Sequence, residues 1–147
     1  MTEQPLGTVV FAAMLLLSGC DASRSTTMLR EAAASSNIGS VEAVEFKGHV
    51  RSTNLYLRAD RSGDIVHIYK VSLPNQSREA VPVYFSRAAY DAELGGLGPP
   101  QIIRGDEVLR LTSGLGIVFN LGGDPTLIWA SDYADDVRSE WADSPRR

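Results

Sequence analysis

Three side chains in this sequence are of the types that most often carry chemistry: the single cysteine, Cys20, and two histidines, His49 and His67. One cysteine permits no internal disulfide, no cysteine-based zinc site and no redox pair, so Cys20 is a buried thiol, a reactive thiol or a modified residue. His67 lies between apolar neighbours in the stretch IVHIY, and His49 follows Gly48 in an expected turn. Neither histidine belongs to an HExxH motif or a close His-carboxylate set, so we predict no metal site and no cofactor.

Motifs for nucleophilic catalysis and phosphate binding are also missing. The sequence contains no G-x-S-x-G elbow, and its glycine-rich stretches GGLGPP and SGLG lack the Lys-Ser/Thr ending of a phosphate-binding loop. We therefore predict that the protein is not an enzyme and has no catalytic residues. The alternative is a hydrolase that uses His67 with a carboxylate from a distant part of the chain.

Acidic residues outnumber basic ones, and they are scattered along the chain. The net charge is −4 over 147 residues, which argues against the basic face that a nucleic-acid partner needs. Five carboxylates near the C-terminus could suggest cation binding, but a helix cannot wrap them around an ion as a loop can. We interpret them as the solvated face of a helix: Asp132, Asp135, Asp136, Glu140 and Asp143.

The residues before Cys20 favour one of its three roles. Val9–Leu17 is an unbroken apolar run, shorter than the roughly 20 residues that span a bilayer but typical of a signal-peptide core. The following residues, Leu17-Ser18-Gly19-Cys20, resemble the lipobox of bacterial lipoproteins. The alternative is a buried N-terminal strand or helix with Cys20 in the core.

The lipobox resemblance implies cleavage before Cys20 and attachment of a diacylglycerol to its thiol, which brings acyl chains such as palmitate. It implies a protein of the bacterial cell envelope that is anchored in a membrane by lipid and faces the periplasm. Asp21, directly after the lipidated position, tilts the choice towards the inner membrane. The first seven residues depart from the pattern because they lack the Lys or Arg that signal peptides normally carry.

The pattern downstream divides the chain into three parts. We expect a signal peptide over residues 1–19, a lipidated cysteine and flexible tether over 20–40, and a globular domain over 41–147. The tether is rich in Ser, Thr and Ala, and a short helix over Met28–Ala34 would be marginal in water by itself.

The globular part shows about seven short runs with strand-like patterns, separated by turn residues. These predict a mainly β fold, a small antiparallel β-sandwich or barrel. The expected strands are Val41–Phe46, Asn54–Arg58, Ile65–Leu73, Val81–Phe85, Glu107–Leu111, Leu115–Leu121 and Thr126–Ala130. The second and third read as a hairpin, and Pro82 indicates an edge strand because it cannot donate a ladder hydrogen bond.

Two helices are expected beside these strands. Ser86–Leu94 combines a capping serine with helix-forming residues and a Gly-Gly stop. Asp132–Trp141 places Val137 and Trp141 at helical spacing, which predicts a short C-terminal amphipathic helix with Trp141 against the sheet.

The segment Leu111–Trp129 is loosely similar to membrane-bound lysozyme inhibitors of the C-type family, which are small lipoproteins with a β-barrel. The similarity lies in the order of a Ser-Gly loop, an aromatic strand, a Gly-Gly pair and a Thr-Leu strand. It nominates one candidate binding loop: Ser113, Gly114, Leu115 and Gly116. The lysine that the family inserts into its target is replaced here by Leu121 or Gly122, and the cysteines of its barrel are missing.

Together these patterns predict a lipid-anchored envelope protein with a small, non-catalytic binding domain. Its partners would be the membrane, through the lipid on Cys20, and another envelope protein. The alternatives are a lysozyme-inhibitor-like lipoprotein and the hydrolase that uses His67.

Overall fold

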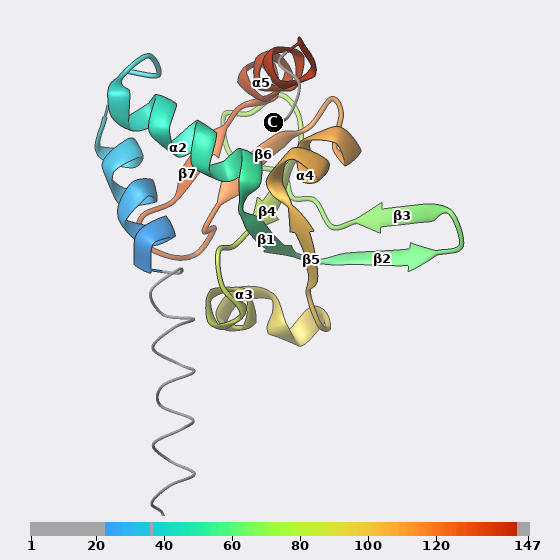
Figure 1. The fold of residues 1–147 in the computed structure, drawn as a ribbon. Coiled ribbons are helices and arrows are strands. Elements are labelled where there is room, and N and C mark those ends of the chain that lie inside the picture. Colours follow the sequence, from blue (N-terminus) through green and yellow to red (C-terminus); the bar gives the residue numbers. More distant parts are fainter. Residues whose placement is uncertain (1–22, 36, 144–147) are drawn as a thin grey trace, which may run out of the picture.

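The computed structural model describes residues 23–35 and 37–143 of the chain (Figure 1). Residues 23–34 are helical. The other α-helices are α2 (Val41–Ser52), α3 (Arg87–Leu94), α4 (Gly105–Leu111) and α5 (Ser131–Asp143), and a short 3-10 helix, η1 (Gly95–Leu97), follows α3. Within these residues, no helix combines the length and the apolar character needed to cross a membrane.

The strands form three small sheets. Strands β1 (Asn54–Leu57) and β5 (Gln101–Arg104) pair antiparallel, and β2 (Ala59–Ser62) and β3 (Ile65–Ile68) form an antiparallel hairpin. The third sheet has the order β4-β6-β7, in which β4 (Ala80–Val83) runs parallel to β6 (Gly116–Phe119) and β7 (Leu127–Trp129) runs antiparallel to it. A bridge between Tyr56 and Tyr84 connects the first sheet to the third.

The prediction of a mainly β sandwich or barrel is wrong. Of the described residues, 46% are helical and 24% are in strands, and none of the sheets they form is closed. Two runs expected as strands, Val41–Phe46 and Glu107–Leu111, lie in α2 and α4. Short apolar runs do not distinguish a strand from a buried helix face, and for α2 the sequence analysis also overlooked a capping residue.

Helix α2 shows such a feature. The side chain of Ser40 accepts a hydrogen bond from the Ala43 N–H at 3.1 Å, which caps the helix. The residues that α2 buries, Phe46 and Val50, are four apart and therefore lie on one helical face. The observed burial follows the period of a helix.

The parallel pair β4–β6 explains the mixed fold. Parallel neighbours need a long crossover, and here it runs through α3, β5 and α4. Every residue of β4 and β6 is buried, as expected for strands that are covered on both faces. Strand β4 forms an edge of its sheet, as Pro82 predicted.

Both predicted helices are confirmed, with small changes in their bounds. Ser86 accepts a hydrogen bond from the Ala89 N–H at 3.1 Å and caps α3. Helix α5 buries Ala134, Val137 and Trp141. The expected hairpin of Asn54–Arg58 with Ile65–Leu73 is wrong: β1 pairs with β5, and β3 forms its hairpin with β2 instead.

The core is centred on an aromatic cluster. The Phe119 ring lies 4.8 Å from the Trp129 ring and 5.0 Å from the Phe46 ring, centroid to centroid, in edge-to-face contacts. The helix of residues 23–34 packs against the same core with Leu29 and Ala32, which are buried. The packed part of the chain therefore begins upstream of Val41, within the segment expected as a tether. The predicted signal peptide and Cys20 lie outside the described residues.

Candidate functional site

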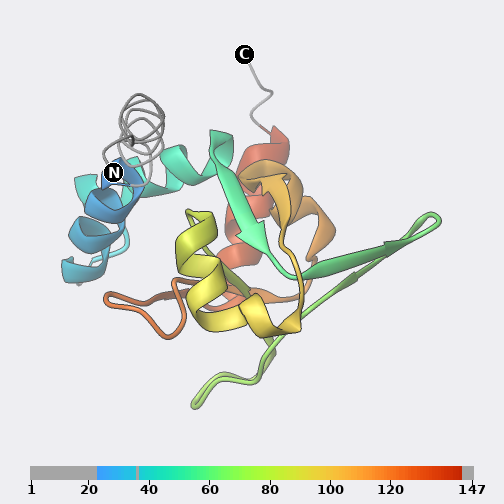
Figure 2. The same cartoon turned by 90° about the horizontal axis from the view of Figure 1, so that it is seen from below.

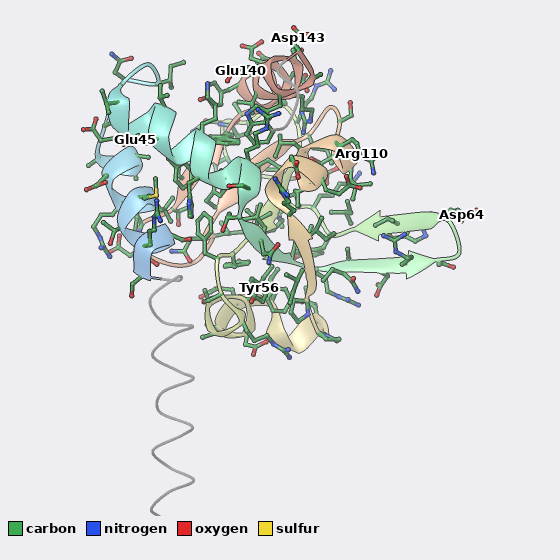
Figure 3. All side chains as sticks on the ribbon, viewed as in Figure 1. Glu45, Tyr56, Asp64, Arg110, Glu140 and Asp143 are labelled. Atoms are coloured by element: carbon green, nitrogen blue, oxygen red, sulfur yellow. The ribbon has the colours of Figure 1, made fainter. Side chains whose placement is uncertain are left out.

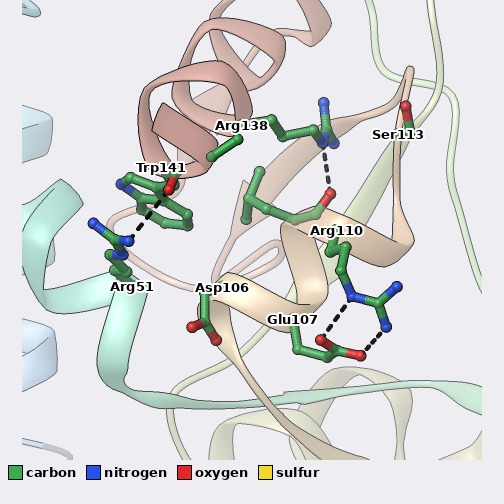
Figure 4. Close-up of a pocket in the computed structure, with 9 residues that line it drawn as sticks. Arg51, Asp106, Glu107, Arg110, Ser113, Arg138 and Trp141 are labelled. Atoms are coloured by element: carbon green, nitrogen blue, oxygen red, sulfur yellow. Dashed lines mark hydrogen bonds and ion pairs between the residues drawn. The ribbon is translucent and has the colours of Figure 1, made fainter. Parts of the chain in front are cut away.

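A pocket of about 450 Å³ lies where α2, α4 and α5 meet (Figure 4). Three arginines, two carboxylates and a tryptophan dominate its lining. The lining residues are Arg51, Asp106, Glu107, Leu109, Arg110, Ser113, Arg138, Trp141 and Ala142.

A glycine brings two of these helices together. Gly105 begins α4, and its N–H donates to the Thr53 carbonyl, just beyond α2, at 2.9 Å. A methyl group at this position would overlap the carbonyl oxygen of Val50. The end of α2 and the start of α4 can approach this closely only because residue 105 has no side chain.

Arg138 fixes the pocket wall formed by the end of α4. Its guanidinium donates to three backbone carbonyls: Leu109 at 2.6 Å, Thr112 at 2.6 Å and Leu115 at 2.9 Å. These oxygens belong to the last turn of α4 and the turn after it, where helices leave carbonyls without partners. Burial lowers the pKa of Arg138, and the neighbouring Asp135 opposes that shift. Arg138 therefore acts as a structural clamp.

Arg51 and Trp141 join α2 to α5 at the other side. The Arg51 Nη2 donates to the Trp141 carbonyl at 3.3 Å, and its Cζ lies 5.7 Å from the centre of the Trp141 ring. The second distance is typical of a cation–π contact. A buried aromatic ring with a guanidinium across it forms this end of the pocket.

The rim of the pocket carries an exposed ion pair. Arg110 Nε donates to Glu107 Oε1 at 2.9 Å, and a second nitrogen of Arg110 contacts the other oxygen. The hydrogen bond, and then the charge of Glu107, raise the pKa of Arg110. Because the two side chains are 67% and 42% exposed, water competes with this pair, and it holds its partners only weakly. A bound ligand can therefore take the place of Glu107 or Arg110 in this ion pair.

The chemical groups around the pocket are suited to binding. The pocket offers guanidinium donors, carboxylate acceptors and an aromatic surface, which recognise polar and apolar groups of a partner. Its one hydroxyl, on Ser113, has no histidine among the lining residues to act as a base. Across residues 23–35 and 37–143, no group of three or more His, Cys, Asp or Glu side chains is placed to hold a metal ion.

The predicted binding loop is divided between two roles. Ser113 is exposed and lines the pocket, whereas Gly114 makes the turn with a φ of 82°. Leu115 packs against the core. Gly116 is buried in β6, where an added Cβ would lie 2.7 Å from the Trp129 carbonyl oxygen. Of these four residues only Ser113 is exposed, and the described residues do not form the β-barrel that the lysozyme-inhibitor resemblance implies.

The two histidines lie apart from the pocket and from each other. His67 is exposed on β3, directly across the hairpin from Asp60. His49 is in α2, contrary to the turn expected there, and its Nε2 lies 2.8 Å from Ser25 Oγ. Burial, followed by the charge of Arg24, lowers the pKa of His49.

The Ser25–His49 pair lines a second, polar cavity of about 340 Å³ and resembles part of a nucleophile–base pair. Ser25 itself is only 4% exposed, and it belongs to the helix of residues 23–34. Its hydrogen bond joins that helix to α2. We therefore interpret the pair as a contact that docks the first described helix on the core.

The C-terminal carboxylates lie as the sequence predicted. All five are exposed on α5, and Glu140 and Asp143 lie on the outer surface of the molecule (Figure 3). Glu140 also forms an ion pair with Lys47 of α2, and the distance from its Oε1 to the Lys47 Nζ is 2.8 Å.

Sequence reasoning missed most of the pocket. Arg51, Arg110 and Arg138 come from three helices far apart in the chain, and no spacing pattern connects them. Trp141 was expected against the sheet, and it also forms the end of the pocket. The only local signal was Ser113.

Comparison with known proteins gives no assignment for this chain. No family model matches it, and neither the curated proteins nor the solved structures contain a significant match.

Proposed function

We propose that this protein is a lipid-anchored binding module of the bacterial cell envelope. Cys20 carries the lipid, and the pocket between α2, α4 and α5 binds another envelope protein without catalysing a reaction. The proposal leaves open whether the lipid enters the inner or the outer membrane, with Asp21 tilting the choice towards the inner one.

The observation that carries the binding role is the composition of the pocket. Arginine and tryptophan are the residues most enriched at the energetic centres of protein interfaces, and three arginines and Trp141 gather around one concavity here. Arg138 and the cation–π contact of Arg51 hold the surface rigid, so binding costs little ordering. The exposed pair Glu107–Arg110 is the part of the rim that a partner can engage.

The lining also indicates the chemistry of the partner. Ala142, which is exposed beside the largely buried Trp141, suits an apolar side chain, and Arg110 suits a carboxylate beside it. We therefore expect the partner to present a segment in which an apolar side chain and an acidic one lie next to each other.

The position of the pocket fits an anchored protein. The helix of residues 23–34, through which the chain from Cys20 enters, lies on one side of the molecule, and α4 and α5 lie towards the other (Figures 1 and 2). A membrane beside the first helix would leave the pocket accessible.

The anchor is tested by metabolic labelling of the full chain with an alkyne analogue of palmitate. The wild type is expected to incorporate the label and to sediment with membranes, and Cys20→Ala is expected to lose both. Equal labelling of the two proteins would contradict the anchor.

The binding role is tested by placing a photo-cross-linking residue at Ser113, on the pocket rim, in cells of the native host. The matched control places the same group at Asp136, which is exposed on α5 and does not line the pocket. One envelope protein is expected to cross-link at position 113 only, and Arg110→Ala is expected to reduce its yield. The same products at both positions, or none at position 113, would contradict the proposal.

A further inference from the structure

The hairpin of β2 and β3 projects from the body of the molecule, with Asp64 at its tip (Figures 1 to 3). Among the residues that the structure describes, only these two strands belong to its sheet. A two-stranded hairpin is marginally stable in water unless it packs on something else. Apolar side chains are nevertheless exposed along it, since Ile65 is 60% and Tyr69 38% exposed.

The outer edge of β3 has a defined set of backbone groups available. The Tyr69 N–H donates to the Arg58 carbonyl at 2.9 Å, so the odd-numbered residues of β3 direct their hydrogen-bonding groups towards β2. In an antiparallel ladder the alternate residues face the other way. The N–H and C=O groups of Val66 and Ile68 therefore point outward, where another strand can pair with them.

The sequence of β3 is complementary to itself when it runs antiparallel about a two-fold axis at His67. Val66 then lies opposite Ile68 of a second copy, and Ile65 lies opposite Tyr69 of that copy. Asp64 lies opposite Lys70 of the second copy, which places opposite charges together at both ends. Apolar pairs on both faces and ion pairs at the ends are the contacts that stabilise neighbouring strands.

Neighbouring registers lack this complementarity. An axis at Val66 would place Asp64 opposite Ile68, and an axis at Ile68 would place Lys70 opposite Val66, so each would set a charge against an apolar side chain. Within the molecule, Lys70 has an exposed ion pair with Glu79 at 3.4 Å. Such a pair contributes little, and Lys70 can exchange it for Asp64 of the second copy.

From this complementarity we infer that β3 is a dimerisation edge, and that two copies of the chain pair there about a two-fold axis at His67. The dimer contains a continuous four-stranded antiparallel sheet with the order β2-β3-β3-β2. It covers the exposed edge of β3, which would otherwise be open to aggregation. None of the β3 residues lines the pocket, so a test of the dimer does not test the proposed function, and the reverse also holds.

The single native cysteine makes a direct test simple. In the full chain with Cys20→Ala, the variant His67→Cys has one thiol, at the proposed axis. Residues opposite each other at a pair without hydrogen bonds have Cα atoms about 4.5 Å apart, which is within disulfide range. Mild oxidation of this variant in detergent solution is expected to give a disulfide-linked dimer.

Arg61→Cys in the same background is the matched control. Residue 61 is exposed on β2, and in the dimer three strand spacings of about 4.8 Å separate the two β2 strands, which is beyond disulfide reach. This variant is expected to stay monomeric on oxidation. Failure of His67→Cys to cross-link, or equal cross-linking of both variants, would overturn the inference.

A second variant tests the contact without a cross-link. Ile65→Lys changes an exposed side chain and places a charge opposite Tyr69 of the second copy, whereas Ile65→Val keeps the apolar contact. Sedimentation of the full chain in detergent is expected to show a dimer for the wild type and Ile65→Val and a monomer for Ile65→Lys. Equal masses for all three proteins would contradict pairing through β3.

Discussion

Strands β3 and β6 have similar sequences, IVHI and GIVF, and opposite environments. Every residue of β6 is buried, whereas the residues of β3 alternate between exposed and half-buried. Strand β6 lies between β4 and β7 with α5 against it, and β3 has β2 as its only partner strand among the described residues. These two short apolar runs both form strands, and the elements packed against each strand decide whether it is buried in the core or projects from the molecule.

The sharpest test of this comparison uses two isoleucines. Ile117→Ala in β6 removes a fully buried side chain and is expected to destabilise the fold by about 2–5 kcal/mol. Ile65→Ala in β3 is expected to change stability by less than about 0.5 kcal/mol, measured at protein concentrations too low for pairing. Urea unfolding measures both, and similar losses at the two sites would show that the hairpin packs more tightly than described.

The next test compares a glycine at the α2–α4 contact with an exposed glycine elsewhere on α2. Gly105→Ala forces a methyl group against the Val50 carbonyl and is expected to cost about 1–3 kcal/mol. Gly48→Ala, in the middle of α2 with open space around it, is expected to stabilise by about 0.5–1 kcal/mol because alanine favours a helix. Thermal unfolding measures whether each variant is more or less stable than the wild type. An unchanged stability of Gly105→Ala would contradict the close approach of α2 and α4.

The docking of the first described helix predicts a dependence on pH. The pKa of His49 is lowered in the folded state from 6.5, because burial and Arg24 disfavour its charged form. As the pH falls below 6.5, the unfolded chain takes up a proton that the folded chain resists, so stability is lost towards the lowered folded pKa. Urea unfolding at pH 7.5 and 5.5 measures the loss, and His49→Gln is expected to reduce it. An unchanged loss in that variant would assign the effect to other groups.

A small change in stability is expected at the pocket rim. Arg110→Ala removes an exposed ion pair with Glu107 and is expected to cost less than about 1 kcal/mol. The same change is expected to reduce cross-linking at Ser113. The effect of Arg110 on binding can therefore be distinguished from its effect on stability. Chemical denaturation of the purified variant measures its stability, and a large loss of stability would place Arg110 in the structure instead of the binding surface.

Elements with strong local signals were predicted from the sequence. Ser86 capped α3 as expected, and the spacing of Val137 and Trp141 identified α5. The exposed carboxylates of α5 and the edge position of Pro82 were also correct. In each case the information lies within a few neighbouring residues, which is the range over which capping, helical spacing and backbone donors act.

The elements that failed depend on distant partners. Val41–Phe46 and Glu107–Leu111 carry apolar residues that fit a strand or a helix, and contacts with the core selected the helix. The same holds for the helix of residues 23–34, which would be marginal alone and is packed through Leu29. Parallel pairing of β4 and β6 joins segments more than thirty residues apart, and neither strand carries a local signal for its direction.

By itself, the sequence determined the local properties of the chain: the capped and amphipathic helices, the turns, the strand-forming runs and the lipobox-like segment at Cys20. Tertiary structure alone decided which apolar runs became core, because burial depends on what packs against each face. It also assembled the pocket, since Arg51, Arg110 and Arg138 line one cavity only because α2, α4 and α5 pack together, with α2 and α4 in close contact at Gly105. The chemistry of each side chain is fixed by its residue type, but a pocket depends on which residues lie close together. The folded chain decides which residues those are.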